Sequence, residues 1–257
     1  MSEVWTRPNY VVGGSTGEIA LIALAMKRLP DPLPISRSQH GMPEEGAGPE
    51  SIALVARERV EDPTWFVDQV VAPFADLIAS DLGPEAAAAA LQAEFAYVIE
   101  GEVADPDDLG HVQAAWAIAK CVCEEGAIVI IDVYAARAHL GTEVAALAAD
   151  RAFDVMHEVT LFFDEQPDGL LAAWSVGLRK FGRPDLVLLG VAPEAATEAA
   201  LVLRDVAATL ADGERIEPGD QVAAPDGRTL TAARFDPEMA PVVAVDGPAL
   251  VLAAAAG

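Results

Sequence analysis

The feature that most constrains the fold of this chain is the alternation, over its whole length, of short apolar runs with longer amphipathic stretches. Strand-sized apolar runs occur at 19–26, 127–135 and 185–191, and helix-length amphipathic stretches occur at 62–82, 105–126 and 193–213. A turn signal at Pro167, Asp168 and Gly169 predicts a hairpin between two further runs. We therefore expect an α+β fold with mixed, mainly antiparallel sheets and helices packed on one face.

Two segments share an outline in which a strand ends in Val-x-Asp-Pro and an amphipathic helix follows. Asp62 and Pro63 begin one of these helices, and Asp105 and Pro106 begin the other. Aspartate is a favourable N-cap, and proline suits the first helical position because its missing N–H needs no partner there. The match has two interpretations, a duplicated β-α unit or the common chemistry of helix starts.

The length of 257 residues allows one large domain or two smaller ones. We expect an N-terminal α+β region over 1–94, with a long Pro- and Gly-rich loop at 28–50, and a C-terminal α+β region over 95–257. One continuous domain is the alternative. The stretch GGSTG (13–17) lacks the Lys-Ser/Thr that completes a phosphate-binding loop, so we predict a hairpin turn between two strands there.

The charge balance narrows the classes of partner. The chain has 16 Lys+Arg and 41 Asp+Glu, a formal net charge of −25, and is 53% hydrophobic. Nucleic acids and anionic membranes bind to basic protein surfaces, so we expect neither as a partner of this chain. A basic protein is the kind of partner that the charge favours. No leader segment is visible, and no apolar run reaches the ~20 residues that span a bilayer. We expect a cytoplasmic bacterial protein, with homo-oligomer formation as a further expectation.

Motifs that carry catalysis or bind metals are missing from the sequence. The four histidines form no His-Glu-x-x-His grouping, and no Gly-x-Ser-x-Gly turn occurs. Cys121 and Cys123 are too few for a zinc site, so we expect buried thiols in a reducing compartment. We predict no catalytic residues, no metal and no cofactor.

Two polar groupings remain as candidate ligand contacts. The first follows the buried run AIVIID, where side chains at a strand end can line a site. The second is a basic cluster within SVGLRKFGRPDL (175–186), whose arginines could hold a carboxylate or phosphate. The candidate ligand-binding residues are Asp132, Tyr134 and Arg137 in the first group, and Arg179, Lys180 and Arg183 in the second. Alternatively, Asp132 pairs with Arg137, and the cations only neutralise acidic neighbours.

Residues 95–192 contain a stretch that resembles a family of uncharacterised bacterial proteins. The stretch follows an Ala-rich helix and a strand ending in Asp, and it has the form Trp-x-x-Gly-x-x-x-Phe-Gly-x-Pro-Asp-Leu. Here it comprises Trp174, Gly177, Phe181, Gly182, Pro184, Asp185 and Leu186. The resemblance implies no catalytic residues. By analogy only, some domains of this sort occur in settings that resemble toxin–immunity loci.

Together these observations favour a non-catalytic, acidic binding protein of immunity or adaptor type. The alternative is a small-molecule enzyme or a sensor of an anionic ligand, with a site near Asp132, Arg179 and Arg183.

Overall fold

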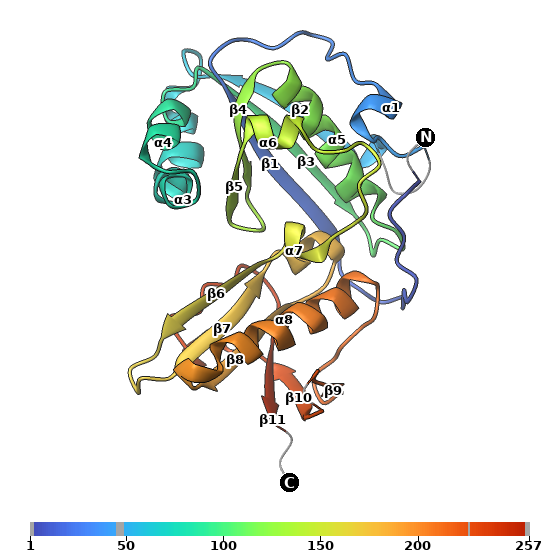
Figure 1. Cartoon of the computed structure of the whole chain (residues 1–257). Helices are drawn as coiled ribbons and strands as arrows, with labels where there is room; N and C mark the ends of the chain where they lie inside the picture. Colours follow the sequence, from blue (N-terminus) through green and yellow to red (C-terminus); the bar gives the residue numbers. More distant parts are fainter. Residues whose placement is uncertain (1–2, 45–48, 226, 255–257) are drawn as a thin grey trace. The chain divides into compact units, whose positions relative to one another are not determined.

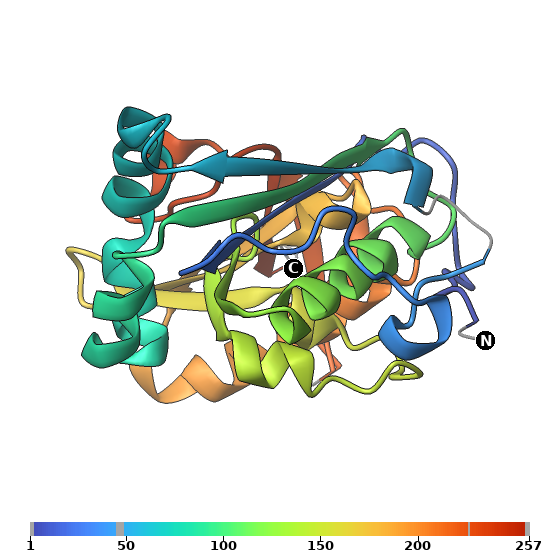
Figure 2. The same ribbon diagram turned by 90° about the horizontal axis from the view of Figure 1, so that it is seen from above.

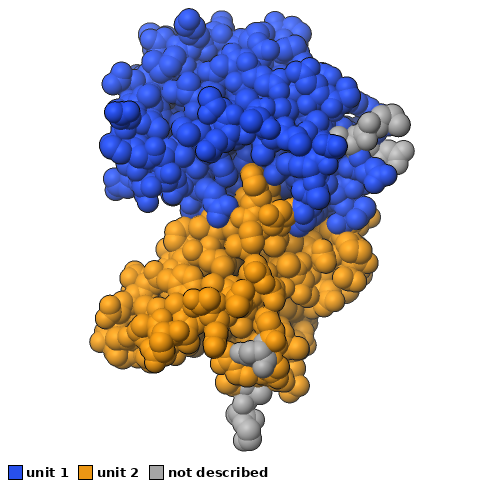
Figure 3. Space-filling view, in the orientation of Figure 1, with its two compact units in different colours: residues 1–6, 18–103, 108–153 blue, residues 7–17, 104–107, 154–257 orange. Residues whose placement is uncertain are grey.

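The computed structural model describes residues 3–44, 49–225 and 227–254, and their α+β fold is the predicted one (Figure 1). The chain forms two compact units (Figure 3). Unit 1 comprises 1–6, 18–103 and 108–153, and unit 2 comprises 7–17, 104–107 and 154–257. The sequence suggested a division after residue 94, but the strand that begins at Phe95 belongs to the sheet of unit 1.

Unit 1 is built on a five-stranded sheet in the order β2-β3-β1-β4-β5. Its strands are β1 (Gly17–Ala25), β2 (Ile52–Glu58), β3 (Phe95–Val103), β4 (Ala127–Asp132) and β5 (Arg137–Leu140). The pairs β2–β3, β1–β4 and β4–β5 are antiparallel. The strand expected before the second Asp-Pro pair is β3, which ends at Val103, and AIVIID forms β4.

The helices of unit 1 include one long helix, α5, whose residues 110–123 are all buried, and several shorter ones (Figure 2). They are α1 (Arg37–His40), η1 (Pro49–Ser51), α2 (Pro63–Phe66), η2 (Val67–Val71), α3 (Ala72–Leu82), α4 (Pro84–Ala90), α5 (Gly110–Glu124) and α6 (Gly141–Ala145). The segment η2 is a π-helical turn that directly precedes α3. Pro73 lies at the start of α3, where its missing N–H is tolerated better than inside a helix.

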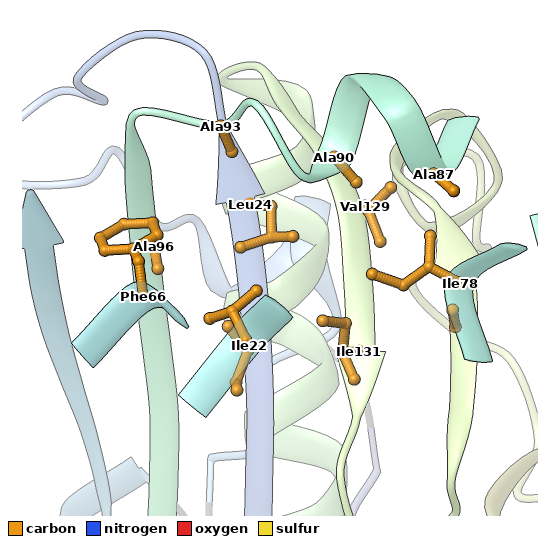
Figure 4. Packing of buried hydrophobic residues seen from close by; sticks show 12 residues of the cluster. Ile22, Leu24, Phe66, Ile78, Ala87, Ala90, Ala93, Ala96, Val129 and Ile131 are labelled. Atoms are coloured by element: carbon orange, nitrogen blue, oxygen red, sulfur yellow. The ribbon is translucent and has the colours of Figure 1, made fainter. Parts of the chain in front are cut away.

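The core of unit 1 lies between the sheet and the helices α2 to α4 (Figure 4). Ile22 and Leu24 of β1 and Ile131 of β4 meet Phe66 and Ile78 from the helices. The residues that alternate with them along β1 are buried as well, so β1 is covered on both faces. The helix α5 contacts β3 and β4. This double burial explains why the strand is apolar throughout.

The two Asp-Pro pairs have different structures, although the sequence predicted a helix start at both. Asp62 is an N-cap whose side chain accepts a hydrogen bond from the Trp65 N–H at 3.1 Å, as predicted. Asp105 is not a cap: its φ is +39°, and α5 begins five residues later at Gly110. The expectation of a second helix start at Asp105 is wrong because its carboxylate binds other groups, described below.

Unit 2 is built on a six-stranded sheet in the order β6-β7-β8-β11-β10-β9. Its strands are β6 (Thr160–Glu165), β7 (Leu171–Val176), β8 (Asp185–Val191), β9 (Gln221–Ala223), β10 (Thr229–Arg234) and β11 (Ala249–Ala254). Its helices are α7 (Val155–Glu158), η3 (Leu178–Phe181), η4 (Pro193–Ala195), α8 (Ala196–Ala211) and η5 (Pro237–Met239). The pair β8–β11 is parallel, and the other neighbours are antiparallel.

The sheet of unit 2 is covered by α8, which contacts β7 and β8, and by a second apolar cluster. In that cluster Trp174 stacks on Phe162 with ring centroids 5.6 Å apart, and Phe235 and Val243 pack beside Val251. The hairpin β6–β7 confirms the turn predicted at Pro167 to Gly169. Between β7 and β8 the chain forms one short helical turn, η3.

Several expected segments differ from the structure or lie outside it. The hairpin predicted across GGSTG is wrong, because residues 9–16 form no strand and only β1 follows them. Residues 45–48 of the long loop, residue 226 in the turn before β10 and residues 255–256 after β11 lie outside the described residues. No helix in the described part of the chain has the length and apolar character needed to cross a bilayer.

Candidate functional site

The first group of candidate residues lies in unit 1 at the end of β4. Asp132 is fully buried and accepts a hydrogen bond from the Ala135 N–H at 3.0 Å, which closes the turn into β5. Arg137 is its register partner in the β4–β5 ladder. The Tyr134 hydroxyl donates to Glu18 Oε2 at 3.2 Å. These contacts order the β4–β5 connection.

The second group lies in unit 2, and each of its three cations has a carboxylate within ion-pair distance. Lys180 is buried, and its Nζ lies 2.7 Å from Oε2 of the equally buried Glu158. Arg179 is partly exposed, and its Nη1 lies 3.3 Å from Oδ2 of the exposed Asp246. Lys180 therefore anchors η3 to α7, whereas Arg179 makes only a surface pair, of a kind that contributes little stability.

Arg183, the third cation, is buried and bound mainly by main-chain carbonyls. Its Nε donates to Glu214 O at 2.8 Å, and its Nη2 donates to Gly213 O at 2.7 Å and Val11 O at 3.2 Å. Its Nη1 donates to Gly182 O at 3.2 Å and lies 3.5 Å from Asp105 Oδ1. The guanidinium therefore links the segment after α8 to the N-terminal segment of unit 2.

A second buried arginine, Arg7, has a similar role. Its Nε and Nη2 donate to Ala211 O and Leu210 O, both at 2.9 Å, in the last turn of α8. A cation at this end of a helix is favourable, because the unpaired carbonyls carry partial negative charge. Burial, together with the nearby Arg183, lowers the pKa of Arg7 to about 10. The side chain therefore remains charged at neutral pH.

The GGSTG stretch binds an anion, but the anion is a carboxylate of the chain itself. The Gly13 and Gly14 N–H groups donate to the two Asp105 oxygens at 2.7 and 2.9 Å, and the Tyr10 hydroxyl donates at 2.9 Å. Burial alone would raise the pKa of this carboxyl, but these hydrogen bonds and Arg183 hold it below its usual value. A Cβ on Gly14 would lie 1.8 Å from Arg183 Nη1, so any larger residue there would displace the Arg183 guanidinium.

Asp185, at the start of β8, is a buried carboxyl of a different kind. It accepts hydrogen bonds from Ser175 Oγ at 3.1 Å and from the Leu178 N–H at 3.2 Å. Burial outweighs these bonds and raises its pKa to about 7. The Ser175 hydroxyl also accepts from the Leu186 N–H at 2.9 Å, which joins β7 to β8. In the stretch that resembles a bacterial family, Asp185 thus has a structural role.

Beside Arg183, unit 2 has a pocket with a volume of about 640 Å³, which we call the arginine pocket. Its wall consists of five short segments of unit 2. They are Gly13–Ser15, Gly182–Pro184, Arg215–Pro218, Arg234–Phe235 and Gly247–Leu250, the last two at the adjoining ends of β10 and β11. A volume of this size is typical of sites for small molecules.

The arginine pocket gathers Arg183, Arg215 and Arg234 in a chain of strongly negative net charge. Arg215 forms an exposed ion pair with Glu217, which also lines the pocket. Arg234 is exposed and has no ion pair with any described residue. The neighbouring pocket of about 550 Å³ is lined by three carboxylates, Asp205, Glu214 and Asp220, and by Arg215. The arginine pocket is thus the better site for an anion.

The sequence analysis identified one residue of this pocket, Arg183, and missed the other two arginines. Arg215 lies in the short loop after α8, and Arg234 ends β10. The pairing of β10 with β11, and of β11 with β8, brings Arg234 to the strand end where Arg183 lies, and the bonds from Arg183 to Gly213 O and Glu214 O hold the loop of Arg215 beside it. A usable signal was Arg215 itself, a lone cation between Gly213 and Pro218 in a loop that follows a helix.

Thiols and histidines contribute no reactive group to the arginine pocket. Cys121 and Cys123 are free and buried in α5, as predicted, and burial raises their pKa values to about 11 and about 12. Both thiols are therefore protonated and unreactive at neutral pH. In the described ranges, no three His, Cys, Asp or Glu side chains gather closely enough to hold a metal ion.

In comparisons with known proteins, no family model matches the chain, and no match was found among curated proteins or solved structures. The resemblance to a bacterial family over residues 95–192 therefore stays a prediction.

Proposed function

We propose that unit 2 binds a small organic anion in the arginine pocket, and that the protein acts by binding rather than by catalysis. The observation that carries this proposal is the gathering of three arginines at one pocket in a chain whose net charge is −25. In such a chain an exposed cation normally finds a carboxylate nearby. Arg234 lines the pocket and has no such partner among the described residues.

The three arginines contribute differently. Arg183 is held by carbonyls and by Asp105, so it supplies positive potential but has few donors left for a ligand. Arg215 and Arg234 are exposed and have donors that can reach a carboxylate or phosphate. The proposed ligand contacts are thus Arg215 and Arg234, with Arg183 behind them.

A thermal-shift screen against anionic metabolites tests the proposal. A ligand that binds only the folded protein raises the melting temperature in proportion to its affinity and concentration. We expect the shift produced by any hit to fall in Arg215→Ala and Arg234→Ala. Arg204→Ala is the matched control, because Arg204 is an exposed arginine of α8 that pairs with its neighbour Asp205 outside this pocket. Equal shifts in all three variants would contradict the proposal.

A second candidate function, binding of a basic protein in an immunity or adaptor role, is favoured by the helical layer of unit 1. Residues 60–94 contain no lysine or arginine but seven carboxylates, of Glu61, Asp62, Asp68, Asp76, Asp81, Glu85 and Glu94. All except Asp62 are exposed. Such a surface would speed and strengthen association with a basic partner at low salt.

Two variants of equal net charge test this second candidate. One carries Asp68→Asn, Asp76→Asn and Asp81→Asn, and the other carries Asp164→Asn, Asp168→Asn and Asp236→Asn, all exposed positions of unit 2. If the helical layer binds a basic partner, only the first variant loses affinity for the basic proteins retained from a lysate at low salt. Equal losses would mean that net charge alone is responsible. Light scattering tests the further expectation of a homo-oligomer.

A further inference from the structure

The arginine pocket combines exposed cations with apolar walls, which restricts the class of ligand. Ile216, Pro218, Phe235, Pro248 and Leu250 line it together with the arginines. A small inorganic anion would leave these side chains uncovered, whereas an uncharged molecule would leave Arg234 unpaired. The composition of the wall matches a ligand that has an anionic group and an apolar body.

Glu217 already supplies a carboxylate inside the pocket. Its Oε1 pairs with Arg215 Nη2, and the two side chains are 54% and 41% exposed. Its main-chain N–H donates to Asp220 Oδ2 at 2.8 Å, which holds the loop after α8 in place. An exposed pair of this kind contributes little to stability, so a second anion can displace it at small cost.

We propose that the ligand is an amphiphilic organic anion whose charged group takes the place of the Glu217 carboxylate on Arg215, while its body packs against Ile216, Phe235 and Leu250. This inference rests on the proposed function. It adds the class of the ligand and identifies the Glu217 carboxylate as a group of the chain itself that competes with the ligand for Arg215. Arg234 contributes attraction at the rim, and Arg183 stays engaged with Gly213 and Glu214. By competing for Arg215, Glu217 lowers the affinity of the pocket for anions in general and favours ligands that also cover the apolar wall of the pocket.

The ligand class is tested with three probes that separate charge from apolar area. The first is 8-anilinonaphthalene-1-sulfonate, the second is N-phenyl-1-naphthylamine, which lacks the sulfonate, and the third is inorganic phosphate, which lacks the rings. We expect the sulfonate to bind at least tenfold more tightly than either of the others, measured by fluorescence titration and by competition. Equal affinity for the sulfonate and the uncharged amine would overturn the proposed class, and so would equal affinity for phosphate.

The competition by Glu217 is tested with a pair of variants that remove one charge from the same loop. Glu217→Gln should bind the sulfonate about threefold to fivefold more tightly, the range expected when an exposed pair is lost. Glu214→Gln is the matched control, because its side chain is exposed and does not line the arginine pocket. The gain in sulfonate affinity from Glu217→Gln should vanish when Arg215 is also replaced by alanine. A general electrostatic effect of removing one negative charge would persist in the Arg215→Ala variant.

The outcomes separate this inference from the proposed function. If Arg215→Ala and Arg234→Ala weaken sulfonate binding but Glu217→Gln and Glu214→Gln behave alike, the competition by Glu217 is refuted and the anion site stands. If neither arginine variant changes the affinity, the site itself is refuted. Melting temperatures of all variants within about 2 °C of the parent exclude misfolding as the cause, since each substitution is at an exposed position.

Discussion

Asp105 is the carboxylate on which the N-terminal segment of unit 2 depends, and Asp105→Asn tests this role. The substitution keeps the shape of the side chain, and asparagine tolerates the left-handed φ of +39° at this position. However, one carboxylate oxygen becomes an NH₂ group that faces the donors of Gly13, Gly14 or Tyr10. Arg183 also loses its only carboxylate within ion-pair distance among the described residues.

The size of the effect follows from these contacts. Hydrogen bonds to a charged group contribute about 1.5–3 kcal/mol each, but the Gly13 N–H is exposed and water can replace its acceptor. The bonds from Gly14 and Tyr10 are partly buried, so we expect a loss of about 3 kcal/mol in the free energy of unfolding of unit 2. Asp107→Asn, two residues away and exposed, should change it by less than about 0.5 kcal/mol.

Urea unfolding of protein labelled with 5-fluorotryptophan can measure this loss separately in the two units. Trp174 lies in unit 2, whereas Trp5, Trp65 and Trp116 lie in unit 1, so their ¹⁹F resonances report the two units independently. The pKa of Asp105 is lowered in the folded state, so its stabilisation is present above pH ~4 and is lost as the pH falls through the folded pKa. Equal stability of Asp105→Asn and Asp107→Asn at pH 7 would refute the role assigned to Asp105.

Three further predictions concern buried groups of unit 2. Burial raises the pKa of Asp185 to about 7, so the stabilisation from its protonated form is present below pH ~4 and is lost as the pH rises to 7. Asp185→Asn should therefore make the free energy of unfolding depend less on pH between ~4 and ~7, as measured by denaturant titrations at several pH values. An unchanged pH dependence would contradict the raised pKa. Lys180→Met should cost about 3–5 kcal/mol because it leaves the Glu158 carboxylate buried without its cation, and adding Glu158→Leu should recover most of that loss. Gly177→Ala should lower the yield of folded protein, because φ is +130° and the new Cβ would lie 2.4 Å from Glu158 O; wild-type yield and melting temperature would argue otherwise.

The fold was largely predictable from local sequence patterns. The two Asp-Pro pairs show when such patterns fail to predict the local structure. At Asp62 the local sequence predicts the structure correctly, because the carboxylate accepts a hydrogen bond from the nearby Trp65 N–H and caps α2. At Asp105 the same dipeptide precedes a helix, but the amides of Gly13 and Gly14, some 90 residues earlier in the chain, take the carboxylate instead. The hairpin prediction across GGSTG failed for the same reason, because the Gly13 and Gly14 N–H groups donate to Asp105 and not to a neighbouring strand.

The candidate site was less predictable, because it depends on strand order. Arg183 stood out in the sequence as a cation beside Gly182 and Pro184, and it lines the pocket. Its donors, however, are used by carbonyls after α8, which no local pattern shows. Arg234 joins it because β11 lies between β8 and β10, and Arg215 joins it because the loop after α8 binds the Arg183 guanidinium. Asp132, Tyr134 and Arg137 belong to unit 1, where the hydrogen bonds of Asp132 and Tyr134 order the β4–β5 turn.

The most direct test of the central claim is an NMR titration of ¹⁵N-labelled protein with 8-anilinonaphthalene-1-sulfonate. Four glycines line the arginine pocket, Gly13, Gly14, Gly182 and Gly247, and glycine amides resonate in a sparsely populated region of the spectrum. We predict that these four amides shift in step with ligand concentration, while those of Gly83, Gly101 and Gly126 in unit 1 do not. Shifts confined to unit 1, or none at the pocket glycines at saturating ligand, would contradict the claim that unit 2 binds an organic anion there.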